Sequence, residues 1–494
     1  MSSERGMLGE ERSDAAASGD SFALQYLGYG FFWAWAWILF FSSVLLSSQT
    51  HGLSAIAGIG TSVPGVEALA LLLMSLFADR ASGPKGRRAM LLGACILGPL
   101  STLAIAFGSQ LDGTAWLTVS LSGMAGLGIV AACMNWLWGT LYSTMDLNRA
   151  TVYMSGSVAL GACVYLGVTY MQSGAALVVA SLLPVVSASM VLLASRGHRS
   201  SPAESRRDRR PTPTFLWRLL LAVAIYAAVF GVLQGITAVK DAQVFDVSNR
   251  YRLLGSGLVG LSIAVGTLTL ARTRRISRTY RMVLPTMVAG LLLLPFLGGD
   301  RRAFAGVLVA VGFQCFDIVT WLASFDVARR LGLSPVKVFG FGRAANAGGV
   351  CVGGLVMLAV GSAVTMSQSV MTALALAAVF LLVVTSTLVL DESVLFSGKD
   401  TAARPEPLAG GEGYSGSWRQ RCERVANDHG LTPREQEVMI LLAKGRDAEY
   451  IQNALVISNH TVKTHRCHIY SKLDIHSQQE LLDLIEGYKS PDST

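Results

Sequence analysis

The sequence predicts an all-α membrane protein, in which a bundle of twelve transmembrane helices is followed by a small soluble helical domain. Of the 494 residues, 52% are hydrophobic and only 15% are charged, a balance that is too apolar for an ordinary soluble protein. Apolar stretches of about 20 residues, the length that crosses a bilayer, recur along most of the chain. After Leu390 the sequence becomes polar and charged, which indicates a separate soluble part.

Twelve apolar segments account for the predicted bundle. The bilayer core offers no water to a backbone amide, so each segment must satisfy its own backbone, and this favours helices. We expect these helices near residues 23–46, 53–78, 89–108, 115–142, 151–171, 173–195, 215–238, 253–271, 282–299, 303–328, 338–361 and 367–390.

The distribution of basic residues predicts the orientation of the bundle. With the N-terminus in the cytoplasm, the inside loops carry 19 Lys and Arg residues, and the outside loops carry five. These five are Lys240, Arg250, Arg252, Arg301 and Arg302. Because basic residues concentrate on the cytoplasmic side, we expect a multi-pass protein of the cytoplasmic membrane with both termini in the cytoplasm.

The segments divide the chain into six parts. The basic stretch 196–214 separates two halves of six helices, and we interpret it as a topology anchor or a contact with anionic lipid, with DNA binding as the alternative. A Gly-, Ser- and Pro-rich stretch follows the second half and is typical of a flexible tether. The predicted parts are a cytoplasmic tail (1–21), the first half (22–195), the linker (196–214), the second half (215–390), the tether (391–417) and the C-terminal domain (418–494).

The C-terminal domain begins with strong helix signals. Thr432 is suited to cap a helix, Pro433 to occupy its first position and Glu435 to complete a capping box. Ser458 is suited to cap a later helix, in which residues 462, 465, 469 and 473 follow a spacing of three or four and should face the core. The opposite face of that helix is the part that a DNA major groove can accept.

The run from L-T-P-R-E-Q-E-V to H-R-C-H-I-Y-S-K-L resembles the LuxR-type helix-turn-helix over about 55 residues. The resemblance implies that the helix from about Asn459 to Leu473 enters the major groove, that the last helix, near 478–487, supports dimerisation, and that the protein binds double-stranded DNA as a homodimer. Gln452 and Cys467 depart from the usual family residues. The expected DNA-binding residues are Ser458, Thr461, Lys463, Thr464, Arg466, Cys467, Tyr470 and Lys472.

The loop L-F-A-D-R-A-S-G-P-K-G-R-R after the second segment resembles the motif that major facilitator superfamily transporters carry between helices two and three. Ser75 stands where that motif usually has glycine. Together with the six-plus-six layout, the resemblance implies a major facilitator-like fold, with ligand sites between the halves near the bilayer midplane.

Polar residues inside apolar segments are costly and therefore candidates for ligand binding. The alternative to ligand binding for Arg343 is a structural ion pair with Asp326, near the cytoplasmic ends of their segments. The candidate ligand-binding residues are Glu67, Asn135, Trp138, Gln314, Asp317 and Arg343, with Trp136, Gln234 and Trp321 as further polar or aromatic lining.

The sequence contains no nucleotide-binding loop, no nucleophile-and-base set and no paired metal ligands, so we expect no enzyme, no cofactor and no metal site. The first hypothesis is a membrane-bound one-component transcription regulator whose bundle senses an unidentified small molecule. The second is a secondary transporter with a DNA-binding regulatory tail, and the third is a bundle that only anchors the domain. The expected partners are DNA, the lipid bilayer and the small molecule.

Overall fold

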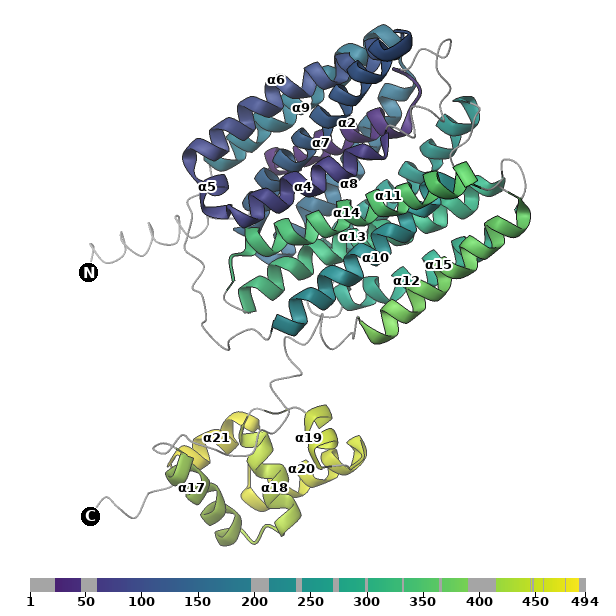
Figure 1. Cartoon of the computed structure of the whole chain (residues 1–494). Coiled ribbons are helices and arrows are strands. Elements are labelled where there is room, and N and C mark those ends of the chain that lie inside the picture. Colours follow the sequence, from purple (N-terminus) through teal and green to yellow (C-terminus); the bar gives the residue numbers. More distant parts are fainter. Residues whose placement is uncertain are drawn as a thin grey trace, which may run out of the picture. The chain divides into compact units, whose positions relative to one another are not determined.

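The computed structural model divides the chain into two compact units, residues 1–396 and 397–494. It describes residues 23–45, 60–196, 213–236, 242–269, 275–297, 301–330, 333–363, 367–389, 415–444, 446, 448–455, 457–475 and 477–487. The predicted tail 1–21, nearly all of the linker 196–214 and most of the tether 391–417 lie outside these residues. The described residues form helices and no strands (Figure 1).

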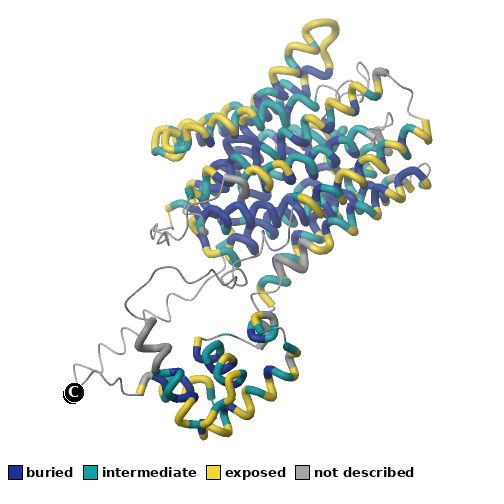
Figure 2. Tube along the Cα trace, turned by 60° about the horizontal axis from the view of Figure 1, so that its bottom comes forward, coloured by how far each residue is buried: buried dark blue, intermediate teal, exposed yellow. Residues whose placement is uncertain are grey.

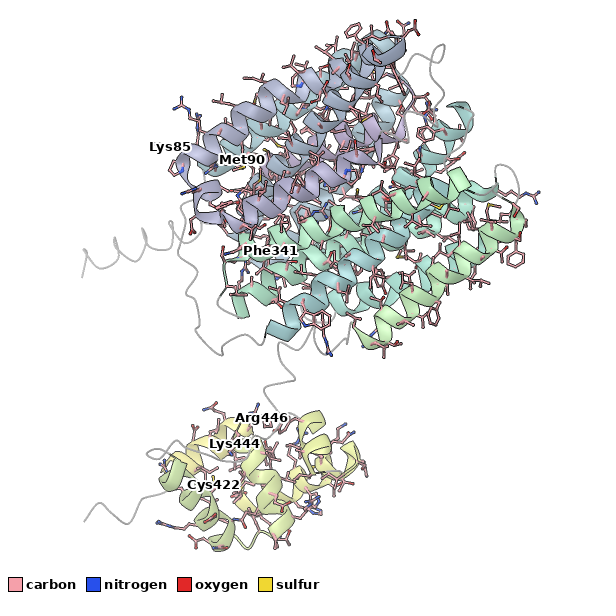
Figure 3. The ribbon with its side chains drawn as sticks, in the orientation of Figure 1. Lys85, Met90, Phe341, Cys422, Lys444 and Arg446 are labelled. Atoms are coloured by element: carbon pink, nitrogen blue, oxygen red, sulfur yellow. The ribbon has the colours of Figure 1, made fainter. Side chains whose placement is uncertain are left out.

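Each of the six apolar segments predicted for the first half contains one helix. Two short helical elements accompany them: η1 (Leu24–Leu27) before the first helix and α5 (Ala78–Ser82) between the second and the third. Lys85, in the first turn of the third helix, points away from the bundle (Figure 3). The six helices are α2 (Tyr29–Phe41), α4 (Ser62–Leu76), α6 (Pro84–Gly108), α7 (Gly113–Ser143), α8 (Leu147–Thr169) and α9 (Ser173–Arg196).

The second half again has one helix for each predicted segment. Its second helix begins at Ala242, eleven residues before the predicted start at residue 253, so Arg250 and Arg252 belong to a helix and not to an outside loop. The six helices are α10 (Pro213–Ile236), α11 (Ala242–Thr269), α12 (Arg275–Leu293), α13 (Arg302–Arg330), α14 (Pro335–Ala363) and α15 (Gln368–Leu388).

The two halves pack their helices in the same way. In each half the first helix packs on the fifth, the second on the fourth, and the third on both the fourth and the sixth. The halves meet along two seams, α4 with α14 and α8 with α11, which pair the second helix of one half with the fifth of the other. This repetition confirms the six-plus-six layout that the sequence predicted.

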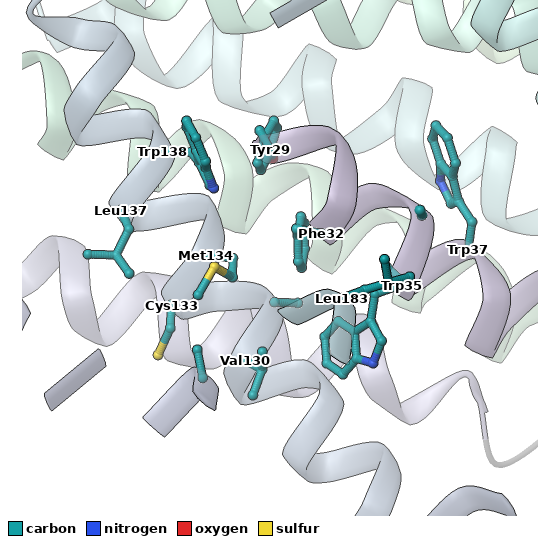
Figure 4. Packing of buried hydrophobic residues seen from close by; sticks show 14 of the residues in the cluster. Tyr29, Phe32, Trp35, Trp37, Val130, Cys133, Met134, Leu137, Trp138 and Leu183 are labelled. Atoms are coloured by element: carbon teal, nitrogen blue, oxygen red, sulfur yellow. The ribbon is translucent and has the colours of Figure 1, made fainter. Parts of the chain in front are cut away.

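Close packing within each half depends on side-chain size. Tyr29, Phe32 and Trp35 on α2 pack against Met134 and Trp138 on α7, in the buried aromatic core of the first half (Figure 4). In the second half α10 and α14 approach so closely that a Cβ on Gly349 would lie 2.2 Å from a backbone oxygen of α10. Small residues therefore set the distance between these two helices.

The outer surface of the first unit is apolar. Within the described part of the chain, every exposed large hydrophobic side chain belongs to this unit, and examples are Leu69, Leu192 and Phe380. Figure 2 shows buried positions along the inside of the bundle and exposed ones on its outer faces. Nine described helices are long and apolar enough to cross a bilayer. A large exposed apolar surface is costly in water and stable in lipid, so we call residues 1–396 the membrane unit.

The C-terminal unit has a hydrophobic core of its own, to which each of its helices contributes. Buried residues include Cys422, Val438, Ile451, Ile469 and Leu481, one from each helix. These helices are α17 (Ser415–Asp428), α18 (Pro433–Ala443), α19 (Ala448–Leu455), α20 (Asn459–Leu473) and α21 (Gln478–Gly487). A separate core is what lets a domain fold independently of the rest of a chain.

Candidate DNA-binding surface and candidate ligand cavity

Helix α20 is the predicted recognition helix, and its local geometry agrees with the sequence. Ser458 caps it: the Ser458 hydroxyl accepts a hydrogen bond from the backbone N–H of Thr461 at 3.1 Å. Val462, Ile469 and Leu473 are buried in the core, while His465, which was also expected to face inward, is only half-buried. Packing of α20 against α18 and α19 therefore leaves one face of α20 open.

The predicted DNA-binding residues divide between this open face and its edges. Lys463, Thr464, Arg466 and Cys467 are exposed. The hydroxyls of Ser458 and Thr461 lie 2.8 Å apart at the helix start, so both take part in the cap. Tyr470 is half-buried at the edge of the open face. Two cationic side chains, Lys463 and Arg466, thus remain exposed on an α-helix, the kind of element that a major groove admits.

Lys472 has a structural partner within the domain. Its ammonium donates to Glu435 Oε2 at 2.8 Å and to the carbonyl of Gly430 at 3.1 Å. Glu435 is buried and also completes the predicted capping box, because the backbone N–H of Thr432 donates to Oε2 at 2.8 Å. Burial alone would raise the pKa of Glu435, but the hydrogen bonds from Lys472 and Thr432 outweigh it and lower the pKa to about 2.

Helices α17 and α21 complete the domain. Helix α17 covers the start of the predicted domain, up to Asp428. Cys422 on α17 (Figure 3) is fully buried, and this burial raises the pKa of its thiol to about 11, so it packs as a neutral side chain. Helix α21 is present over the residues that the sequence assigned to dimerisation and packs on α17 and α18.

A cavity of about 170 Å³ lies in the membrane unit between its two halves. Its walls come from α2, α4 and α7 of the first half and from α10, α11, α13 and α14 of the second. Five of the six ligand-binding residues that the sequence singled out line it together: Glu67, Asn135, Gln314, Asp317 and Arg343. Gln234, named as further lining, is also there.

The polar residues of the cavity form two hydrogen-bonded groups. In the first, Tyr29 donates to Asn135 Oδ1 at 2.5 Å, and the Asn135 amide donates to Glu67 Oε1 at 2.8 Å. In the second, Arg343 donates to Asp317 Oδ1 at 2.5 Å, and Asn346 donates to the same oxygen at 3.0 Å. The Arg343 guanidinium also lies 4.9 Å from the ring centroid of Trp321. The ion pair of Arg343 is thus with Asp317, in place of the pair with Asp326 that the sequence left open.

Trp138 is the one selected residue that the cavity excludes. Its ring is fully buried against Tyr29 and Tyr142, and its Nε1–H donates to Ser187 Oγ at 3.1 Å. The polar atom of this side chain is therefore satisfied within the first half. Trp136 and Trp321, named as further lining, are likewise buried side chains outside the cavity wall.

The cavity also contains residues that sequence reasoning missed. Arg252 was assigned to an outside loop, because the polar start of α11 masked the helix. Asn249 lies in the same polar stretch, and Asn346 lies inside the predicted segment 338–361 but was not among the expected lining residues. Asn249 and Arg252 are three residues apart, so they lie on one face of α11. A predicted helix that began before residue 249 would have brought both polar side chains to attention.

Hydrogen bonds join the halves near both ends of the bundle. Near the predicted cytoplasmic face, Arg329 of α13 donates to the carbonyls of Ser143 and Met145, at the end of α7. Near the opposite face, Asp246 of α11 accepts from the backbone N–H and the hydroxyl of Ser43, each at 2.7 Å. The cavity lies between these two sets of contacts. Within the described residues no group of three His, Cys, Asp or Glu side chains is placed to hold a metal ion.

Comparisons with known proteins bear on both units. The family model for bacterial regulatory proteins of the luxR family (GerE) matches residues 429–485. The uncharacterized response regulatory protein YgeK of Escherichia coli (strain K12) is 38% identical over 81 residues, 16% of this chain and 55% of that protein. The chain therefore spans about half the length of this curated relative.

The membrane unit aligns with solved transporter structures at low identity. A bacterial homologue of the iron transporter ferroportin, in its outward-facing state, has a TM-score of 0.47 and 11% identity over 76% of this chain and 96% of that one. The major facilitator superfamily transporter FucP, in the outward conformation, has a TM-score of 0.47 and 12% identity over 74% of this chain and 98% of that one. Likenesses at this level say nothing about what the membrane unit binds.

The C-terminal match covers α18 to α21 and includes the capped helix α20 with its open basic face. The membrane unit repeats one helix-packing pattern in two halves of six. Residues 429–485 of the C-terminal unit therefore match the luxR family of bacterial regulatory proteins, and the chain joins this unit to a membrane unit whose described helices form two halves of six with one packing pattern.

Proposed function

We propose that this protein is a membrane-bound one-component regulator, in which a small molecule in the cavity of the membrane unit controls DNA binding by the C-terminal domain. The observation that carries the proposal is the convergence of Glu67, Asn135, Gln314, Asp317 and Arg343 on one cavity, in a chain that also contains a luxR-family domain. Buried charges in a membrane unit are costly and are typical of functional sites.

A ligand can regulate only if it prefers one conformation of the membrane unit. The bonds from Arg329 to the end of α7 and from Ser43 to Asp246 join the two halves at opposite ends of the cavity. A ligand held by residues of both halves would favour one arrangement of these contacts. That preference is the source of free energy for moving the tethered domain between DNA-competent and incompetent states.

On the DNA side, we propose that Lys463 and Thr464 lie near base edges and that Arg466 and Thr461 face phosphates. Phosphate contacts position a domain, and base contacts select the sequence. Pairing through α21 would place two copies of α20 on two half-sites, with the raised effective concentration that tethering gives. We also propose that both termini lie in the cytoplasm, as the basic loops favour.

The test is genome-wide mapping of DNA bound by the full-length protein, repeated in cells that carry Glu67→Gln or Asp317→Asn. Bound operators near regulated genes are expected for the unaltered protein, and changed inducer response is expected for the two variants. Glu423→Gln, on α17 outside both sites, serves as the control. An inducer response that stays the same in both cavity variants would contradict sensing through the cavity and favour a bundle that only anchors the domain.

A second candidate is a secondary transporter with a regulatory tail, which the two-fold helix repeat favours because alternating access rocks one half against the other. Measuring substrate flux and reporter expression in the same Glu67→Gln and Asp317→Asn strains separates the two. Flux that is present in the unaltered protein and lost together with regulation would favour the transporter.

A further inference from the structure

Arg252 on α11 lines the cavity and has no acidic partner. Its guanidinium makes one hydrogen bond, from NH1 to Asn249 Oδ1 at 3.4 Å. Its Nε is buried without a hydrogen-bond partner, and no carboxylate oxygen of the described residues lies within 4.0 Å of its nitrogens. Arg252 is therefore a cation in the cavity wall whose charge is not balanced locally.

The acidic groups around the cavity are already engaged. Asp317 accepts from both Arg343 and Asn346, and Glu67 accepts from Asn135. On α11 itself, Asp246 accepts two hydrogen bonds from Ser43. Arg343, the other cation of the cavity, thus contacts Asp317 directly, whereas Arg252 contacts none of the described carboxylates.

A guanidinium that contacts no carboxylate is costly inside an apolar helix bundle. The Arg252 guanidinium packs beside Gly306, near the start of α13. Charges inside membrane segments ordinarily pair with one another or line a binding path. A bound anion would complete the arrangement, because a guanidinium binds a carboxylate with two parallel hydrogen bonds.

Aromatic side chains make up a large part of the cavity wall. Trp37, Phe40 and Phe41 line it from α2. Phe230 and Phe313 line it from the second half, with ring centroids 4.0 Å apart and nearly parallel planes. Flat apolar walls of this kind favour an aromatic body, because rings stack or meet edge to face.

We propose that the cavity binds a small aromatic monocarboxylate, with its carboxylate on Arg252 and its ring among the aromatic side chains of α2, α10 and α13. One guanidinium that contacts no carboxylate favours a ligand with a single carboxylate, and a cavity of about 170 Å³ fits a compact molecule. The inference rests on the proposed function, since it names the chemical class of the ligand for the same cavity.

The test uses the full-length protein, purified in detergent, with five probes: benzoate, 2-naphthoate, their neutral amides benzamide and 2-naphthamide, and benzylamine. Binding is measured by quenching of tryptophan fluorescence, to which Trp33 and Trp37 in the cavity wall contribute, and by thermal stabilisation. The carboxylates are expected to bind and to raise the melting temperature in proportion to their concentration, and the amides and the amine are not.

Variants then assign the charge to Arg252. Arg252→Gln is expected to weaken carboxylate binding at least about tenfold, Arg252→Lys to weaken it less, and the exposed control Arg301→Gln to leave it unchanged. The comparison of carboxylates with amides on the unaltered protein requires no variant, so a misfolded Arg252→Gln does not remove the test. Equal binding of acids and amides, or stronger binding of benzylamine, would overturn the proposal.

Transcription separates this inference from the proposed function. If carboxylates bind through Arg252 but DNA binding at no operator changes, the proposed ligand class is supported and the proposed sensing function is contradicted. If a neutral or cationic inducer acts through Glu67 and Asp317 in cells, the sensing function is supported and the ligand class is contradicted.

Discussion

The ammonium of Lys472, at the end of α20, lies 2.8 Å from the buried carboxylate of Glu435, at the start of α18. The same carboxylate oxygen accepts from the backbone N–H of Thr432, so one acidic group joins the cap of α18 to the end of the recognition helix. The ammonium also donates to the carbonyl of Gly430, whose φ of +63° makes the turn between α17 and α18. A charge within the domain therefore links the end of α20 to the start of α18.

Replacing Glu435 by Gln should destabilise the C-terminal domain by about 1–3 kcal/mol, because a charge-assisted hydrogen bond is lost and the buried amide cannot satisfy both donors equally. Urea unfolding of a fragment of residues 415–494, which contains the whole separate core, measures this free energy. The matched control is Glu437→Gln, since Glu437 is in an exposed pair with Arg434 and should change stability by less than about 0.5 kcal/mol. Equal losses in both variants would contradict a special role for Glu435.

The stability of the same fragment should depend on pH in the acid range. The folded-state pKa of Glu435, about 2, lies below its ordinary value of 4.5. The stabilisation from its ionised form is thus fully present above about pH 4.5 and is lost as the pH falls toward 2. Melting temperatures measured from pH 6 to pH 2 should fall more steeply for the unaltered fragment than for Glu435→Gln. Parallel curves would show that Glu435 titrates normally.

The fold was predictable wherever apolar length or helix caps carried the signal. Thr432, Pro433 and Glu435 predicted the start of α18 because a capping box is a local pattern of four residues. The start of α11 was not predictable from apolarity, because Asp246, Asn249, Arg250 and Arg252 make its first turns as polar as a loop.

The site residues were predictable where a single residue stands out from its sequence context. A charge inside an apolar segment pointed to Glu67, Asp317 and Arg343, and the structure brings them to one cavity. The sequence could not show that Trp138 donates its N–H to Ser187, 49 residues away, or that the Lys472 ammonium donates to Glu435. Such partners depend on how helices distant in sequence pack.

Lys463 and Lys472 should therefore affect DNA binding by different routes. Lys463 is exposed on the open face of α20, and Lys463→Ala should weaken specific binding by about 1–3 kcal/mol without changing stability. Lys472→Ala should lower the unfolding free energy in the same way as Glu435→Gln, with strong coupling in the double variant. Fluorescence anisotropy with an operator found by mapping, together with urea unfolding, measures both quantities.

Ser471→Ala, exposed on the same helix, is the control for both lysine variants. The salt dependence of binding provides a further check, because a lost phosphate contact reduces its slope by about one. A reduced slope for Lys472→Ala, at a temperature where the variant is fully folded, would show that Lys472 contacts phosphate and contradict a purely structural role.

In the membrane unit, the pair of Asp317 and Arg343 allows a similar separation of stability from function. Asp317→Asn leaves the Arg343 guanidinium buried without its counter-ion and should cost about 3–5 kcal/mol, seen as a lower melting temperature of the full-length protein in detergent. Asp112→Asn is the control, since Asp112 is exposed at the start of α7 and makes no capping hydrogen bond.

Replacing both partners, as Asp317→Leu with Arg343→Met, should restore most of the stability, because a buried ion pair contributes little more than apolar packing of the same volume. If regulation by the inducer is absent in this stable double variant, the pair is retained for function; if regulation persists, the pair is only structural and the cavity acts through its other residues.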